Sequence, residues 1–546
     1  MKFIQNIISI ALFMMLFPLL GMAQKDLPSG QVEVIRNFDA RLLETDPLRV
    51  RPELPALDTA IRRMRYDTLS RTFEVTYQPP RIRPLAMQGE DIAKGYNGYA
   101  RLGGGFPGSV LGEGGYTVNV EDQYNFGINV FHHSANNNKN VENQRFGYTN
   151  LGARGTYYLE QGFGVSANLG YTIDNVHFFG YNALNEERDP DITFASEDVK
   201  QSFTTFDVGA RLFNSKRTEA DFNYHAGFNA YFMQDNYAAR ENGFKLDIGA
   251  TKWFNEKHPF RINLITDFTG YRDTASQSLN NFYLQPNFTF HGERFKAKIG
   301  ANITSHEDEF SFFPDVELSA NIINTLLGAY VGAEGSLQKN TFRSLTDYNP
   351  FLSSRIMLEN TRYTHYYGGI RGNFSGVEYR AQLGFKQADD LALFLVNADT
   401  LVPRFDVLYD TVNIFNIQGT LSFPLTKELT VLGTINYNLY DTQNEEKAWH
   451  LPALTINSGL RYSALEGKLL VKADLFLENG VPFRNDKGEA ENLNALFDIS
   501  LGADYLFTEN IGAFVQINNL ANNRRQRWQY YPMFGLNALI GVTARF

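Results

Sequence analysis

The stretch FTTFDVGARLF, residues 203–213, alternates apolar and polar side chains one by one. The apolar positions are Phe206, Val208, Ala210 and Leu212. The positions between them are Thr205, Asp207, Gly209 and Arg211. Because successive side chains of a β-strand point to opposite faces, this stretch predicts a strand with one apolar and one polar face.

The same period of two returns from Gly95 to Phe546 and never changes to a helical period. Clear examples are FKLDIGA (244–250), LTINSGLRY (454–462), LFDISLGADYLF (496–507) and GLNALIGVTARF (535–546). In the last of these the apolar row ends on the aromatic ring of Phe546, and Arg545 lies on the other face. The sequence therefore predicts an all-β protein of two-faced strands.

Short and long links alternate between the predicted strands. The short links are residues 159–162, 214–218, 255–258, 292–294, 426–428, 465–467 and 508–510, and the long ones include 132–144, 181–200 and 479–492. Short periplasmic turns and longer external loops are typical of a transmembrane, antiparallel, up-and-down β-barrel, and counting them predicts ~22 strands. A soluble propeller or sandwich is the alternative, but no second sheet is apparent to cover the apolar faces. The segments 391–396 and 404–410 lack a short turn and are interpreted as a hairpin within an external loop.

Composition agrees with strands that face two environments. The chain has 45 Phe, 29 Tyr and 3 Trp, or 14% aromatic residues, yet its mean hydropathy is −0.31. The net charge of −10 argues against a nucleic-acid partner, which would need basic surface to replace phosphate counterions. There are no cysteines, which excludes disulfides and thiolate metal sites.

The first 94 residues differ from the rest. Residues 1–23 have Lys2, an apolar run from Ile7 to Leu20 and a small-x-small end, which predicts a signal peptide cut between Ala23 and Gln24. A membrane-anchoring helix is the alternative, but the run is shorter than the ~20 residues that such a helix needs. Residues 24–94 are proline-rich and form a periplasmic or lumenal segment, and the sequence leaves open whether it plugs the barrel or binds a partner. Residues 95–546 are the predicted barrel.

Charged residues fall on the polar face of the predicted strands. A charge at the lipid midplane costs ~2–4 kcal/mol for Arg or Lys, so these side chains are expected to face the lumen. The lumen-facing candidates are Asp207, Arg211, Lys245, Asp247, Arg461, Lys472, Asp474, Asp498, Asp504 and Arg545. Their signs are mixed, which argues against a channel with one strong ring of charge. The simplest interpretation of most of them is mutual neutralisation across the wall.

The segment INNLANNRRQRWQYYPMFGLNALIGVTARF, residues 517–546, resembles the last hairpin of TonB-dependent receptor barrels. The matching positions are Asn518, Asn519 and Leu520, then Tyr530, Tyr531 and Pro532 of the loop, then Gly535 and Phe546 of the closing strand. Residues 347–363 also resemble a mid-barrel loop of those receptors with an Asn-Pro core. The resemblance implies the outer membrane of a Gram-negative cell, where the assembly machinery reads Phe546 as a C-terminal signal.

The resemblance has a departure in the N-terminal region. Those receptors carry a globular plug ahead of the barrel, and residues 24–94 are too few for one. The chain therefore resembles a relative of the Bacteroidetes type without a full plug domain. Val32–Ile35 is the one candidate for a TonB box.

No motif for catalysis or cofactor binding is found. The sequence has no Gly-x-Ser-x-Gly elbow, paired zinc histidines or phosphate loop, so no enzyme, metal or cofactor is expected. Adjacent His132 and His133 point apart on an extended chain, and the acidic tip 305–309 is interpreted as solvated.

Two functions are therefore expected. The first is uptake or permeation of a solute across the outer membrane. The alternative is a non-transporting structural or accessory subunit of an outer-membrane complex, which binds periplasmic partners through residues 24–94 by strand addition. The expected partners are outer-membrane lipid, the assembly machinery and other outer-membrane or periplasmic proteins.

Overall fold

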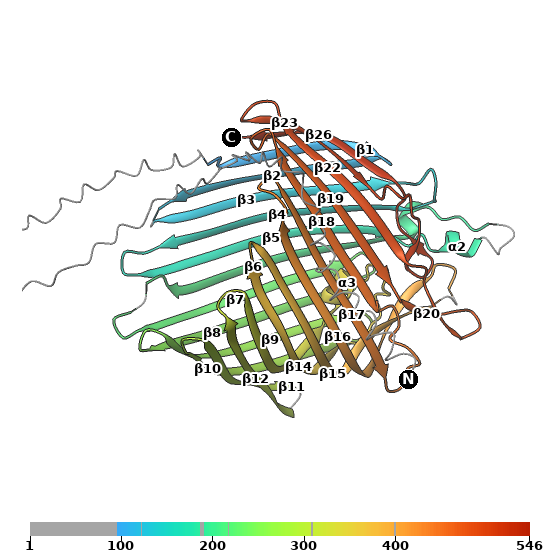
Figure 1. Cartoon of the computed structure of the whole chain (residues 1–546). Coiled ribbons are helices and arrows are strands. Elements are labelled where there is room, and N and C mark those ends of the chain that lie inside the picture. Colours follow the sequence, from blue (N-terminus) through green and yellow to red (C-terminus); the bar gives the residue numbers. More distant parts are fainter. Residues whose placement is uncertain (1–94, 122, 186–190, 217, 307–308, 398–399) are drawn as a thin grey trace, which may run out of the picture. The chain divides into compact units, whose positions relative to one another are not determined.

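The structure, a computed structural model, describes residues 95–121, 123–185, 191–216, 218–306, 309–397 and 400–546. Its main element is a single 22-stranded antiparallel sheet that closes on itself (Figure 1). The predicted all-β fold, the barrel and the strand number are confirmed. The signal peptide, the segment 24–94 and the TonB-box candidate lie outside the described residues.

Strands that follow one another in the sequence are neighbours in the barrel wall. Its first half comprises β1 (Gly98–Phe106), β2 (Ser109–Val120), β3 (Tyr124–Asn136), β4 (Arg145–Tyr158), β5 (Phe163–His177), β6 (Lys200–Asn214), β7 (Phe222–Asp235), β8 (Arg240–Phe254), β9 (His258–Arg272), β10 (Ser276–His291) and β11 (Phe295–His306). The second half comprises β12 (Glu309–Ile323), β13 (Leu327–Asn340), β14 (Glu359–Phe374), β15 (Val377–Asn397), β16 (Arg404–Pro424), β17 (Leu429–Thr442), β18 (Leu454–Ala464), β19 (Leu469–Asn479), β22 (Leu496–Leu506), β23 (Ile511–Asn518) and β26 (Asn537–Arg545).

Short elements lie in the loops. They are the helices α2 (Tyr181–Asn185) and α3 (Phe342–Tyr348), a 3-10 turn (Ser196–Asp198), and the small strands β20 (Pro482–Arg484), β21 (Ala490–Asn492), β24 (Gln526–Trp528) and β25 (Tyr531–Pro532). No helix of the described residues is long and apolar enough to cross a membrane.

The barrel closes between its first and last strands. β1 pairs with β26 from Tyr99 opposite Arg545 to Phe106 opposite Ala538. Beyond this ladder, the backbone N–H of Gly98 donates to the carbonyl of Phe546 at 2.7 Å, and the N–H of Phe546 donates back at 2.9 Å. The closure pairs every strand of the wall on both edges, which removes the exposed edges that an open sheet would leave.

The outer face of the wall carries the apolar row of each strand. On β26, Ile540 and Val542 are 68% and 57% exposed, and on β6 Phe206 and Leu212 are also exposed. Within the described residues, no second sheet covers these side chains. An apolar outer band on a closed barrel is the arrangement of a barrel that spans a membrane.

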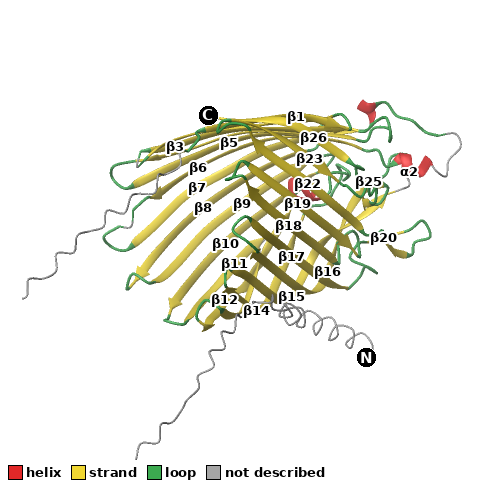
Figure 2. Ribbon diagram, turned by 45° about the horizontal axis from the view of Figure 1, so that its top comes forward, coloured by secondary structure: helices red, strands yellow, loops and turns green. Residues whose placement is uncertain are grey.

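The two ends of the barrel differ (Figure 2). The end that holds β1's first residue and β26's last residue has only short links; we call it the short-turn end. The other, the long-loop end, carries the segments 178–199, 341–358, 443–453, 480–495 and 519–536. Four links at this end are short as well, since two to four residues join β1 to β2, β7 to β8, β9 to β10, and β11 to β12.

Residues 391–396 and 404–410 pair as a hairpin, as predicted, but this hairpin is continuous with the wall. β15 and β16 are continuous strands of 21 residues each, and the predicted hairpin is their upper part. Their pairing shifts register between Ala388 and Leu391, where Asp390 has φ +56°. Such a bulge bends a strand without ending it, so the ladder continues past the barrel rim.

Candidate functional site

Loops at the long-loop end pack into one apolar core, which we call the loop cap. Its buried side chains include Phe178 and Tyr181 before β6, Phe342, Leu345 and Leu352 between β13 and β14, Phe405 of β16, and Trp528 and Tyr531 between β23 and β26. The rings of Phe351 and Tyr531 stack at 3.8 Å between centroids. Since burying aromatic rings dominates core energetics, loops from distant parts of the wall are held together as a single body.

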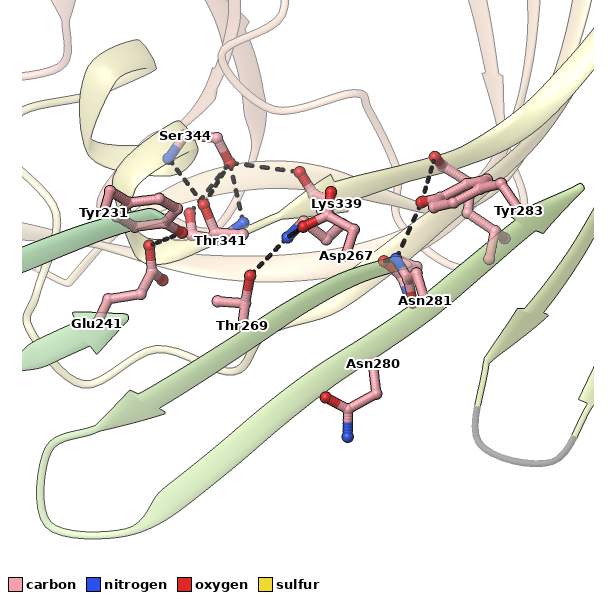
Figure 3. A network of polar contacts seen from close by, with 12 residues as sticks. Tyr231, Glu241, Asp267, Thr269, Asn280, Asn281, Tyr283, Lys339, Thr341 and Ser344 are labelled. Carbon is pink, nitrogen blue, oxygen red and sulfur yellow. Dashed lines mark hydrogen bonds and ion pairs between the residues drawn. The ribbon is translucent and has the colours of Figure 1, made fainter. Parts of the chain in front are cut away.

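The helix α3 begins the segment between β13 and β14, which contributes Phe342, Leu345 and Leu352 to this cap. Its first turn is a capping box: the hydroxyl of Thr341 accepts from the N–H of Ser344 at 3.1 Å, and the hydroxyl of Ser344 accepts from the N–H of Thr341 at 2.9 Å (Figure 3). The pattern Thr-x-x-Ser before an apolar run therefore starts a helix where β13 ends.

The carboxylate of Glu241 holds the start of α3 to the wall. Glu241 is fully buried on β8, where its two oxygens accept from the N–H of Phe342 at 2.6 Å and that of Arg343 at 3.1 Å. The hydroxyl of Tyr231 on β7 donates to the same carboxylate at 2.8 Å. The Tyr231 ring lies over Gly243, where an added Cβ would come within 1.9 Å of it. Glu241 thus satisfies two helix N–H groups that have no partner within the helix.

A second contact fixes the strand that leads into α3. The ammonium of Lys339, at the end of β13, lies 2.5 Å from a carboxylate oxygen of Asp267 and 2.5 Å from the hydroxyl of Thr269, both on β9 (Figure 3). Both partners of this ion pair are largely buried. A pair that is shielded from water is screened less by salt than a surface pair.

The third contact crosses the interior of the barrel. Arg343 of α3 binds Asp207 of β6 with both arms of its guanidinium, at 2.6 and 3.2 Å. β6 and β13 are seven positions apart in the wall, so α3 has to lie inside the barrel to make this bond (Figure 1). The adjacent Asp347 has a raised pKa because it is buried, although Arg343 opposes this effect.

Other loops complete the cap around Trp528. Its ring lies 5.4 Å from that of Tyr348 and 5.6 Å from that of His450. The Nδ1 of His450 is 2.7 Å from the carbonyl of Phe394, and burial lowers the pKa of His450 to about 4. Arg527 pairs with the buried Glu478 at 3.0 Å. The cap therefore joins the loops of β13–β14, β17–β18 and β23–β26.

The predicted lumen-facing charges fall into several separate groups. Asp207 is the partner of Arg343; Asp247 lies 3.3 Å from His225, Arg461 lies 2.6 Å from Asp474, and Asp504 binds Lys472 at 3.3 Å and Arg101 at 2.9 Å. Asp498 accepts hydrogen bonds from Ser500 and from the N–H of Asn519. Within the described residues, Arg211, Lys245 and Arg545 form no ion pair. Arg211 lines a hollow with His225, and Arg545 lines another with Arg101 and Asp504.

The residues that hold α3 in place were missed by the sequence reasoning. They are Glu241, Asp267, Lys339 and Arg343, and the partner of Asp504 that was missed is Arg101. Only the capping pattern at Thr341 carried a local signal. No group of three or more His, Asp or Glu suited to a metal ion occurs in the described part of the chain. His132 instead has its two ring nitrogens beside Thr149 and Ser134.

The chain resembles known proteins in its fold but not in its sequence. No protein-family model matches the chain, and no curated protein matches it. Among solved structures, the ferric-catecholate import receptor Fiu of Escherichia coli K12 matches with a TM-score of 0.61 and 9% identity, over 83% of this chain and 82% of that one. The siderophore receptor PirA of Acinetobacter baumannii matches with a TM-score of 0.60 and 10% identity, over 82% and 80%.

A third neighbour is the pyoverdine outer-membrane receptor FpvA of Pseudomonas aeruginosa. It matches with a TM-score of 0.60 and 10% identity, over 83% of this chain and 78% of that one. The fold is that of large receptor barrels of the cell outer membrane. At this level of sequence identity, the similarity establishes the architecture alone. It does not assign a function to any residue of this chain.

Proposed function

We propose that the protein takes up a solute across the outer membrane through its lumen, and that the loop cap is the gate. The observation that carries the proposal is α3, which is folded into the barrel and bonded to β6 and β8. The short-turn end would face the periplasm and the long-loop end the outside, as in barrels with short periplasmic turns. Likeness to siderophore import receptors supports uptake as the direction.

The cap has the properties of a gate because its contacts are of two kinds. The apolar core joins the loops to one another and also reaches the wall, where the ring of Phe342 lies 5.8 Å from that of Phe203 on β6 and 5.3 Å from that of Tyr271 on β9. Charged contacts at Glu241 and Asp207 add to this attachment of α3. A loop body that is internally packed can move as a unit when its polar bonds to the wall are replaced and Phe342 leaves its contacts with Phe203 and Tyr271. Displacement of α3 would open the polar interior from the outside.

Conductance across a planar lipid bilayer tests this function. The mature chain and a form that lacks residues 24–94 are compared, each with and without Glu241→Ala. We expect the wild-type barrel to open rarely and the Glu241→Ala barrel to conduct often. Current that increases further on truncation would support residues 24–94 as a second closure at the periplasmic side.

The opposite result would overturn the proposal. If all four forms stay silent while folded, and the protein is isolated with other outer-membrane proteins, an accessory role in a complex replaces transport. Surface labelling of cysteines introduced into the 480–495 loop would independently test which end faces outward.

A further inference from the structure

Two arginines face each other on the inner side of the wall. Arg371 of β14 and Arg380 of β15 are direct cross-strand partners. Both lie on the face opposite the exposed apolar Ile370 and Leu383. Like charges placed directly opposite each other destabilise a strand pair, so this arrangement calls for a compensating group.

An aromatic ring holds both guanidinium groups in place. The Cζ atoms of Arg371 and Arg380 lie 5.5 and 5.9 Å from the centroid of the buried Tyr330 ring. The Tyr330 hydroxyl donates to the amide oxygen of Gln382 at 3.0 Å, which fixes the ring. Gly369 leaves room for it, because a Cβ there would lie 2.7 Å from the Tyr330 hydroxyl. The two cations are thus both held near the same aromatic ring.

No carboxylate of the described residues neutralises the pair. Neither arginine takes part in an ion pair there. Glu378 lines the same hollow two residues from Arg380 but forms no ion pair with it. Glu317 accepts a hydrogen bond from the hydroxyl of Tyr367 at 3.1 Å. The charged side chains that line the hollow are therefore two arginines and one carboxylate, with a net charge of +1.

The pair borders a hollow of about 730 Å³ in the part of the lumen near the short-turn end. Its other polar lining includes Asn321, Asn373, Thr420, Ser422 and Thr434. These amides and hydroxyls can donate hydrogen bonds beside the guanidinium groups. Arginine binds carboxylate and phosphate through two parallel hydrogen bonds, which suits an oxyanion of either kind.

We propose that Arg371 and Arg380 form a binding site for the oxyanion group of a solute that passes through the lumen. The site would select a cargo that carries a phosphate or carboxylate group. This assignment of the cargo rests on the proposed transport function. Tyr330 acts as a positioning residue. Glu378 lowers the affinity by its negative charge.

Equilibrium dialysis of the full mature chain in detergent, with labelled inorganic phosphate and with citrate, tests the site. We expect saturable binding to the wild type, weaker by about tenfold or more in Arg371→Gln and in Arg380→Gln, and absent in the double variant. Arg211→Gln removes another unpaired lumenal arginine and serves as the matched control, with binding unchanged. Glu378→Gln is expected to bind more tightly, and weaker binding there would contradict the site.

Comparing phosphate with citrate shows which acidic group the site binds. Binding of phosphate alone assigns a phosphorylated solute, and binding of citrate alone assigns a carboxylate. No saturable binding of either anion to wild type would overturn the proposal, as would full binding in the double variant or equal loss in Arg211→Gln. Dialysis does not depend on passage, so a barrel that binds phosphate but never conducts would refute transport and retain the site.

Discussion

Replacing Glu241 by alanine should release α3 from the wall and open the barrel. The change leaves the N–H groups of Phe342 and Arg343 without an acceptor in a buried place. Each unsatisfied group costs about 1–3 kcal/mol, so the closed state should lose about 3 kcal/mol in all. Since about 1.4 kcal/mol is a factor of ten, the ratio of open to closed barrels should rise about 100-fold.

A graded series makes the assay sharper. Glu241→Gln keeps one acceptor oxygen and should raise the open ratio by about tenfold, half of the alanine effect in free energy. Asp247→Asn is the matched control, because Asp247 lies on the same strand but contacts His225 instead of α3. Open probability is measured for single barrels in a planar bilayer, and folding is checked by the mobility of unheated protein in SDS gels. A folded Glu241→Ala barrel with the open probability of wild type would refute the role of this carboxylate.

Three further predictions follow from the cap and the closing strand. Trp528→Ala removes a buried ring that contacts Tyr348 and His450, which should cost about 3–5 kcal/mol of cap stability, and limited proteolysis should then cut the loops faster than in wild type. In the closed cap, burial lowers the pKa of His450 from 6.5 to about 4. As the pH falls, His450 therefore takes up a proton at a higher pH in the open cap than in the closed cap. The closed state should therefore lose about 3 kcal/mol as the pH falls from 6.5 to 4. Hydrogen-exchange protection factors of residues 443–453, which are corrected for the intrinsic pH dependence of exchange, should then fall in wild type but not in His450→Phe, and equal protection factors at pH 7 and pH 5 in wild type would contradict this. Deletion of Phe546 removes its two backbone bonds to Gly98 and its ring contact with Tyr116, so fewer barrels should reach the cell surface, and wild-type surface levels in that variant would argue against this role.

The wall of the barrel was predictable because its information is local. In residues 203–213, alternation alone assigns the two faces of β6, and the spacing of turns was enough to count the strands. The continuation of β15 past the rim was not predictable, because it depends on a bulge at Asp390 that leaves the apolar pattern on both sides intact.

The cap and its attachment could not be predicted, because they join residues that are far apart in the chain. Glu241 lies about a hundred residues before Phe342, and nothing near either position indicates the other. The pairing of Arg371 with Arg380, in contrast, could have been predicted. Ser375 and Gly376 both have positive φ, as a two-residue turn of type I′ requires, and counting outward from that turn places Arg371 opposite Arg380.

The loop cap also constrains the order in which the molecule assembles. The amide of Gln144 donates to the carbonyl of Pro532, 388 residues away, and the ring of Tyr531 packs just before the last strand begins. Contacts between residues so far apart in the chain form late in folding. Closing such a long loop costs conformational entropy, and the intervening chain has to be in place before the contact can offset that cost. Closure of the wall joins Gly98 to Phe546, which lie still farther apart in the chain. Both the wall and the loop cap are therefore completed only after residues 519–546 have been synthesised.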